Sequence, residues 1–173
     1  VISGFGAANI LPWRAYMTPT NINTAFGTGP DLIGLTILRL RIPYQANDFS
    51  QQVPTAQSAH AMGVLIIASP WTPPPSMKTN NNIVGGRLKT TSYADYAAHL
   101  KSFADYMANN GAPLYALSLQ NEPDVTVTYE SCDWNAAEML QFVKENAPAI
   151  GTDIFVPESF NFNHTISDAI LND

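Results

Sequence analysis

Five short runs of apolar and β-branched residues recur along the chain, and the longer stretches between them have the spacing of helices. The runs are VISGF at 1–5, LTILRLRI at 35–42, VLIIAS at 64–69, LYALSL at 114–119 and IFVPES at 154–159. Runs of this kind are typical of strands in a parallel sheet, which is buried on both faces. Because the strands alternate with helices, the sequence predicts an α/β fold with a parallel sheet.

Local start signals place the helices between these runs. Thr18 and Pro19 have the residue types preferred at the N-cap and at the first helical position. Ser92 is expected to cap a long helix over 93–107, where apolar residues recur at spacings of three and four. The other expected helices cover residues 50–61, starting near Pro54, and residues 136–147. We expect the chain to end after its last strand without a closing helix.

Polar and aromatic residues follow the apolar runs, at the positions where the strands should end. They are Arg41 and Tyr44, Trp71, Asn121 and Glu122, and Glu158 and Ser159. The carboxyl ends of parallel strands lie side by side, so these side chains are expected to converge on one cleft. The QNEPD stretch at 120–124 then contributes an amide and a carboxyl group to a site. The alternative is that this stretch only forms a turn.

Two architectures place strand ends in this way, and the sequence favours one of them. A nucleotide-binding sheet needs a glycine-rich fingerprint, but Asn9 stands where the third glycine should follow Gly4 and Gly6. A (β/α)8 TIM barrel needs eight strands and roughly 250 residues. Residues 1–173 are therefore expected to form a partial catalytic barrel domain that covers roughly the first five β/α units.

The composition argues against several classes of partner. The formal net charge is −6 with eight lysines and arginines, whereas nucleic-acid-binding proteins concentrate basic residues. No run of about 18 apolar residues is present, so no membrane span is expected. The spacing of histidines and carboxylates suggests no metal site, and His60 and His99 are expected to be surface or packing residues. His164 is expected in a loop.

Six ordered motifs together resemble glycoside hydrolase family 30, in particular its xylanase and glucuronoxylanase branch. The motifs are GFGAANILPW, LTILRLRIP, IIASPWTPPPSMKTN, GGRLK, LYALSLQNEPD, and VPESF followed after five residues by ISDAILND. They cover essentially the whole chain, whereas NEP alone occurs in many related barrel glycosidases. The resemblance implies a retaining endo-β-1,4-xylanase that acts on the polysaccharide xylan and needs no cofactor. It also implies a secreted, extracellular enzyme that is monomeric when complete, with a side β-domain that this chain lacks.

The resemblance assigns roles to the residues at the end of the fourth strand. Glu122 matches the general acid/base of the family, and Asn121 matches the residue that hydrogen-bonds the sugar 2-hydroxyl. A retaining enzyme also needs a nucleophilic carboxylate about 5–5.5 Å from the proton donor. The family nucleophile follows strand seven, beyond Asp173. Glu158 matches a PES motif instead and is expected to support the site.

Other side chains are candidates for binding the sugar chain. Trp71 is expected to form a subsite wall, because its flat ring can stack on a sugar, and a core tryptophan is the alternative. Arg41 could orient a catalytic glutamate through charge-assisted hydrogen bonds, or it could form a structural ion pair. Asp124 is interpreted as a turn residue or a helix-start residue. The remaining candidate substrate-binding residues are Trp13, Tyr44, Trp134 and Ser159.

Two alternatives to a xylanase stay open at this point. The chain could be a non-catalytic carbohydrate-binding piece whose aromatic residues hold sugars, or the complete enzyme could act on a β-glucan or a β-glucoside. By resemblance, the arginine that makes some members require a glucuronic acid branch also lies beyond Asp173. Because the nucleophile is expected there too, the chain alone is expected to lack hydrolytic activity.

Overall fold

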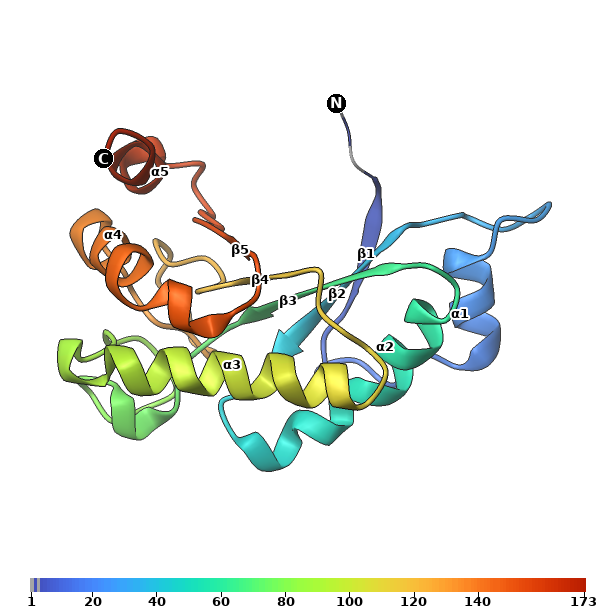
Figure 1. The fold of residues 1–173 in the computed structure, drawn as a ribbon, viewed down its shortest axis with the longest axis horizontal. Helices are drawn as coiled ribbons and strands as arrows, with labels where there is room; N and C mark the ends of the chain where they lie inside the picture. The colour runs from blue at the N-terminus through green and yellow to red at the C-terminus, as the bar shows by residue number, and fades with distance from the viewer. Residues whose placement is uncertain (1, 3) are drawn as a thin grey trace.

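The computed structural model describes residue 2 and residues 4–173, and its centre is a five-stranded parallel sheet (Figure 1). The strands lie in chain order, and each pairs in parallel with the next. They are β1 (Gly6–Asn9), β2 (Ile37–Ile42), β3 (Leu65–Pro70), β4 (Ala116–Ser118) and β5 (Ile154–Phe155). The predicted α/β class with a parallel sheet is confirmed.

The first strand lies further along the chain than its sequence pattern indicates. Positions 1 and 3 of the predicted strand lie outside the described residues, and residues 4 and 5 precede β1. Gly6 lies so close to β2 that a Cβ atom on it would be 2.7 Å from the carbonyl oxygen of Ile37. Small residues permit this approach but have low strand propensity, which is why the pattern did not mark them.

The two faces of the sheet differ in polarity. Leu38, Leu40 and Ile42 of β2 belong to the hydrophobic core, which the helices cover. The alternate residues Arg39 and Arg41 make their hydrogen bonds with polar groups in or after the carboxyl ends of the neighbouring strands. This alternation follows from the two-residue period of a strand. Figure 1 shows α2 and α3 along one side of the strands, so the face with the arginines lies opposite these helices.

Four helices match the segments that the sequence predicts. In α1 (Pro19–Phe26), the Thr18 hydroxyl accepts a hydrogen bond from the Asn21 N–H at 3.2 Å, as expected of an N-cap. The other three are α2 (Val53–His60), α3 (Tyr93–Asn109) and α4 (Ala136–Glu145). All the apolar residues expected on one face of α3 are buried, namely Tyr93, Tyr96, Ala97, Leu100, Phe103, Ala104 and Met107.

Two expectations about helices are wrong. Ser92 does not cap α3, because it ends a 3-10 helix, η3 (Thr90–Ser92), and its backbone is not extended (φ −108°, ψ 7°). The chain also does not end without a helix, since α5 (His164–Leu171) follows β5. Its signal was a single cap: the Asn163 side chain accepts a hydrogen bond from the Thr165 N–H at 2.9 Å. The apolar residues of α5 repeat over a single turn, from Ile166 to Ile170, and so short a repeat does not reveal a helix in the sequence.

The long segment between β3 and α3 is folded against the segment that follows β4. Lys78 is fully buried, and its ammonium group donates to the Ser131 carbonyl at 2.6 Å and to the Thr72 hydroxyl at 2.8 Å. Burial lowers the pKa of Lys78 and raises the pKa of the nearby Cys132 thiol to about 12. The remaining 3-10 helices are η1 (Ala46–Gln52), η2 (Pro75–Met77) and η4 (Ala147–Ile150). Across residue 2 and residues 4–173, no helix combines the length and apolar composition that a bilayer span needs.

Candidate active site

The segment that follows β4 is held on both sides by its neighbours. The Asn121 N–H donates to the Pro70 carbonyl at 2.8 Å, and the Glu122 N–H donates to the Glu158 carbonyl at 3.1 Å. Gln120 is buried, and its amide nitrogen donates to the Trp71 carbonyl at 2.8 Å. The segment therefore extends the parallel pairing beyond the strand ends, as the bridge between Asn121 and Glu158 shows.

Glu122 has an unusual backbone conformation. Its φ of 48° lies in the left-handed region, which costs a residue with a side chain roughly 1–2 kcal/mol. Strain of this kind persists only where the surrounding structure fixes it, and it is concentrated at functional sites. Here the hydrogen bonds on both sides of Glu122 fix it. The direction in which the side chain of Glu122 leaves the backbone is thus set by the neighbouring segments.

Arg39 is the central polar residue of the site, although no feature of the sequence distinguishes it from the other residues of its strand. Its Nη2 donates to Oδ1 of Asn121 at 2.6 Å and to Oε1 of Glu158 at 2.9 Å, and its Nε donates to the Ser69 hydroxyl at 3.1 Å. The guanidinium carbon lies 4.8 Å from the centroid of the Trp71 ring. Because Arg39 occupies the carbonyl oxygen of Asn121, the amide nitrogen of Asn121 is the group left to donate to a ligand.

Arg41 forms the structural ion pair that was one of its two expected roles. Its guanidinium binds the Glu130 carboxylate at 2.9 Å through Nε and at 2.6 Å through Nη2, and both side chains are largely buried. It also lies near the rings of Trp13 and Tyr44, at 5.5 Å and 5.8 Å from their centroids. Arg41 thus supports the aromatic residues, and the arginine beside Asn121 is Arg39.

Glu122 lies between two hollows at the carboxyl end of the sheet. The smaller hollow, of about 610 Å³, is lined by Trp13, Trp71 and Tyr129 together with Glu122. The larger one, of about 700 Å³, has Arg39 and Asn121 beside Glu122 on one side and the β5–α5 loop on the other. Glu122 is the residue that both share, so its carboxyl group can reach a ligand that extends from one hollow into the other.

The smaller hollow has aromatic walls. Trp13 is 42% exposed and Trp71 is 8% exposed, and their ring centroids are 5.4 Å apart in an edge-to-face arrangement. Tyr129 belongs to none of the sequence motifs, and its ring centroid lies 6.3 Å from that of Trp13. Partial desolvation raises the pKa of Tyr129, and the charge of Glu122 and a hydrogen bond to its carboxyl group act in the same direction. Tyr129 therefore stays a neutral donor beside Glu122.

Three candidate binding residues are not placed or free to bind a sugar chain as expected. Trp134 is 4% exposed and packs in the core, where its ring is stacked on that of Tyr93 with the centroids 6.0 Å apart. It lines neither hollow, so it is not placed to bind the sugar chain as expected. Tyr44 is half-buried beside Arg41 and lines neither hollow. Ser159 does line the larger hollow, but its hydroxyl proton is donated to Asp124 at 2.6 Å. The sequence pattern could not show these partners because they come from distant segments.

The three histidines lie in different surroundings: one is exposed, one packs against a neighbouring segment and one lines the larger hollow. His60 is exposed at the end of α2, and His99 is half-buried in α3, where its Nε2 lies 3.0 Å from the Pro43 carbonyl. Burial lowers the pKa of His99. His164 begins α5, not a loop as expected, and lines the larger hollow. Within the described part of the chain, no group of three or more potential ligands is arranged to hold a metal ion.

Comparison with known proteins adds to this geometry. The glycosyl hydrolase family 30 TIM-barrel domain matches residues 33–153. Glucuronoxylanase XynC of Bacillus subtilis (strain 168) is 42% identical over 177 residues, which is 100% of this chain and 42% of that protein. The chain thus spans less than half the length of this relative.

Two solved structures are similar over nearly the whole chain. The family 30 subfamily 8 xylanase Xyn30A of Clostridium acetobutylicum superposes with a TM-score of 0.88 at 42% identity, covering 99% of this chain and 46% of that one. A family 30 endoxylanase of Clostridium papyrosolvens C71 superposes with a TM-score of 0.82 at 37% identity, and the match covers 99% of this chain and 46% of that one. Because the domain match extends over most of the sequence and the sheet has the same architecture, the chain belongs to glycosyl hydrolase family 30, and its five strands are part of that family's TIM barrel.

Proposed function

We propose that this chain is part of a retaining endo-β-1,4-xylanase of the glucuronoxylanase kind, in which Glu122 is the general acid/base. The observation that supports this most strongly is the position of Glu122 at the junction of two hollows, in a strained conformation that both neighbouring strands fix. A carboxyl group in this place faces the bond between two sugars if one sugar occupies each hollow. The aromatic walls of the smaller hollow suit the flat faces of sugar rings.

The proposed reaction has two steps. Glu122 first donates its proton to the departing glycosidic oxygen while a second carboxylate attacks the anomeric carbon, and Glu122 then takes a proton from the water that releases the sugar. The amide nitrogen of Asn121 donates to the 2-hydroxyl, a hydrogen bond that strengthens toward the transition state. Arg39 fixes that amide by occupying its oxygen. No cofactor or metal takes part in this scheme.

Glu158 is the described carboxylate that could be mistaken for the nucleophile. One of its oxygens is paired with Arg39 at 2.9 Å, and its backbone carbonyl accepts from Glu122. These contacts suit a residue that holds Arg39 and the strand ends in place. We assign the nucleophile to the part of the relatives' length that this chain does not cover.

The names of the relatives support the proposed substrate, and the size of that substrate supports the proposed location. XynC is named a glucuronoxylanase, and the two Clostridium proteins are named a xylanase and an endoxylanase. Xylan is a polymer, so an enzyme that cleaves it internally has to meet it outside the cell. We therefore propose a secreted enzyme that acts on xylan as a monomer.

The test uses the full-length enzyme with glucuronoxylan and with unbranched xylan. Glu122→Gln removes the proton donor but keeps the shape of the side chain, and Glu145→Gln on the exposed face of α4 is the matched control. We expect Glu122→Gln to lose at least about 100-fold in kcat on both polymers, because general acid–base catalysis contributes that much, and Glu145→Gln to match the wild type. Wild-type products whose masses are set by the branches would establish glucuronoxylan as the preferred substrate. An unchanged rate for Glu122→Gln would overturn the assignment.

A further inference from the structure

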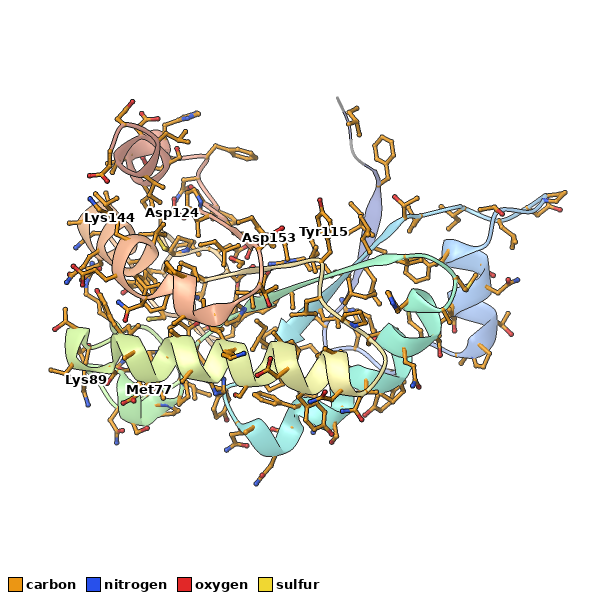
Figure 2. The ribbon with its side chains drawn as sticks, viewed as in Figure 1. Met77, Lys89, Tyr115, Asp124, Lys144 and Asp153 are labelled. Carbon is orange, nitrogen blue, oxygen red and sulfur yellow. The ribbon has the colours of Figure 1, made fainter. Side chains whose placement is uncertain are left out.

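Asp124, two positions after Glu122 in the sequence, binds the loop that follows β5. Its carboxylate accepts a hydrogen bond from the Ser159 hydroxyl at 2.6 Å and another from the Phe160 N–H at 2.9 Å. Its backbone carbonyl accepts a third from the Asn161 side chain at 3.2 Å. A hydroxyl-to-carboxylate bond of this length is in the strong, charge-assisted range. Figure 2 shows Asp124 on the side of the molecule where α4 and α5 lie.

The contact continues from Asp124 into helix α5. The Ser159 oxygen that donates to Asp124 also accepts from the Asn163 N–H at 2.8 Å. Asn163 in turn caps α5 through its side-chain oxygen. A connected series of hydrogen bonds therefore runs from the segment of Glu122 to the first turn of α5.

The loop held in this way forms one wall of the larger hollow. Ser159, Phe160, Phe162 and Asn163 all line that hollow with Glu122. The loop's large apolar side chains do not anchor it, because Phe160 is 56% exposed and Phe162 is 85% exposed. Phe162 also has a strained backbone, with a φ of 51°. Since apolar burial contributes little here, polar contacts have to fix the position of the loop, and the carboxylate of Asp124 makes two of them.

We propose that Asp124 is a positioning residue for the proposed glycosidase reaction. It fixes the β5–α5 loop relative to Glu122 and so sets the width of the larger hollow in which the substrate is bound. It does so through Ser159 and without touching the substrate. The inference rests on the proposed function, since it gives the width of this hollow a role in binding xylan.

The experiment measures kcat and KM of the full-length enzyme on glucuronoxylan for a small set of variants. Asp124→Asn removes the charge that both donors bind, Ser159→Ala removes one donor, and Ser159→Thr keeps a hydroxyl group. Asp105→Asn, whose carboxylate is paired with Lys101 on the exposed side of α3, is the matched control. Thermal unfolding of each variant checks that the assays are run on folded enzyme.

We expect Asp124→Asn and Ser159→Ala to raise KM by about fivefold or more while kcat stays within about threefold of the wild type, since the lost bonds order the binding wall and not the reacting groups. Ser159→Thr should have the wild-type KM. The double variant that combines Asp124→Asn with Ser159→Ala should have the KM of Asp124→Asn alone, because the two residues act through one contact. Wild-type KM in folded Ser159→Ala would overturn the inference, as would additive effects in the double variant. The proposed function is judged separately: it fails if Glu122→Gln is active, whatever the Asp124 variants do.

Discussion

At the scale of single residues, Arg39 occupies the side-chain oxygen of Asn121 and leaves the side-chain nitrogen available for the proposed hydrogen bond to a sugar. Asn121 can donate to a sugar hydroxyl only if its nitrogen, and not its oxygen, is free for the ligand. Arg39 ensures this by donating to the oxygen, while Glu158 and Ser69 hold the guanidinium group in place. The planar guanidinium group suits this task because its donors point in fixed directions toward several acceptors.

Arg39→Lys tests this role directly. Lysine keeps the charge, but its single ammonium group cannot match the geometry of three separate acceptors. We expect kcat/KM of the full-length enzyme on glucuronoxylan to fall by roughly 10–100-fold, which corresponds to losing charge-assisted hydrogen bonds. Arg87→Lys, in the partly exposed ion pair with Glu138, is the control and should change little. Equal kcat/KM values for the two lysine variants would show that the bonds of Arg39 are not needed.

The sequence located Asn121 and Glu122 at a strand end because a local motif marks them. It could not distinguish the roles of Arg39 and Arg41, which lie on the same face of one strand. Which arginine meets Asn121 and which meets Glu130 depends on where two distant segments are folded. The contacts of Trp134 and Ser159 could not be predicted for the same reason, since their partners lie far away in the sequence.

At the scale of elements, periodic patterns were reliable and isolated signals were not. The apolar face of α3 was predicted residue by residue, because it repeats over several turns and packs against the sheet. The cap of α1 was also predicted, since Thr18 and Pro19 reinforce each other. The position of β1 and the presence of α5 were missed, because four small residues and one short helix give almost no periodic signal.

Thr18 and Ser92, the residues that precede α1 and α3, provide a matched test of capping. Thr18→Ala removes a hydroxyl that accepts from the Asn21 N–H, so it should lower the free energy of unfolding of the full-length enzyme by about 1 kcal/mol. Ser92→Ala removes a side chain that makes no capping hydrogen bond, so its effect should be within about 0.5 kcal/mol. Denaturant unfolding measures both. A larger loss for Ser92→Ala than for Thr18→Ala would contradict the capping geometry.

At the scale of the whole molecule, the sheet is open. β1 and β5 are its edge strands, and a hollow of about 600 Å³ near the amino ends of β4 and β5 is lined by apolar residues such as Ile67 and Phe155. Tyr115 and Asp153, at the rim of this hollow, are labelled in Figure 2. In a complete TIM barrel the sheet closes on itself and leaves no edges. Exposed edge strands tend to pair with other chains.

A chain of residues 1–173 on its own is therefore expected to associate and to lack hydrolytic activity on xylan. The edges and the apolar hollow favour association, and the proposed mechanism needs a second carboxylate that we place elsewhere. Size-exclusion chromatography with light scattering measures the association, and an assay on glucuronoxylan measures the activity. The full-length enzyme is measured in parallel for comparison. A stable monomer that cleaves xylan would show that these residues form a complete active site.

In the proposed mechanism, Glu122 exchanges protons with the substrate and is not the nucleophile. Full-length Glu122→Ala, given an aryl β-xyloside with a good leaving group and added azide, tests it most directly. An acid/base variant still forms the glycosyl-enzyme with such a substrate but cannot activate water, so azide should increase the rate and give the β-glycosyl azide. No rescue, or an azide product of inverted α configuration, would contradict the account, since the latter identifies the missing residue as the nucleophile.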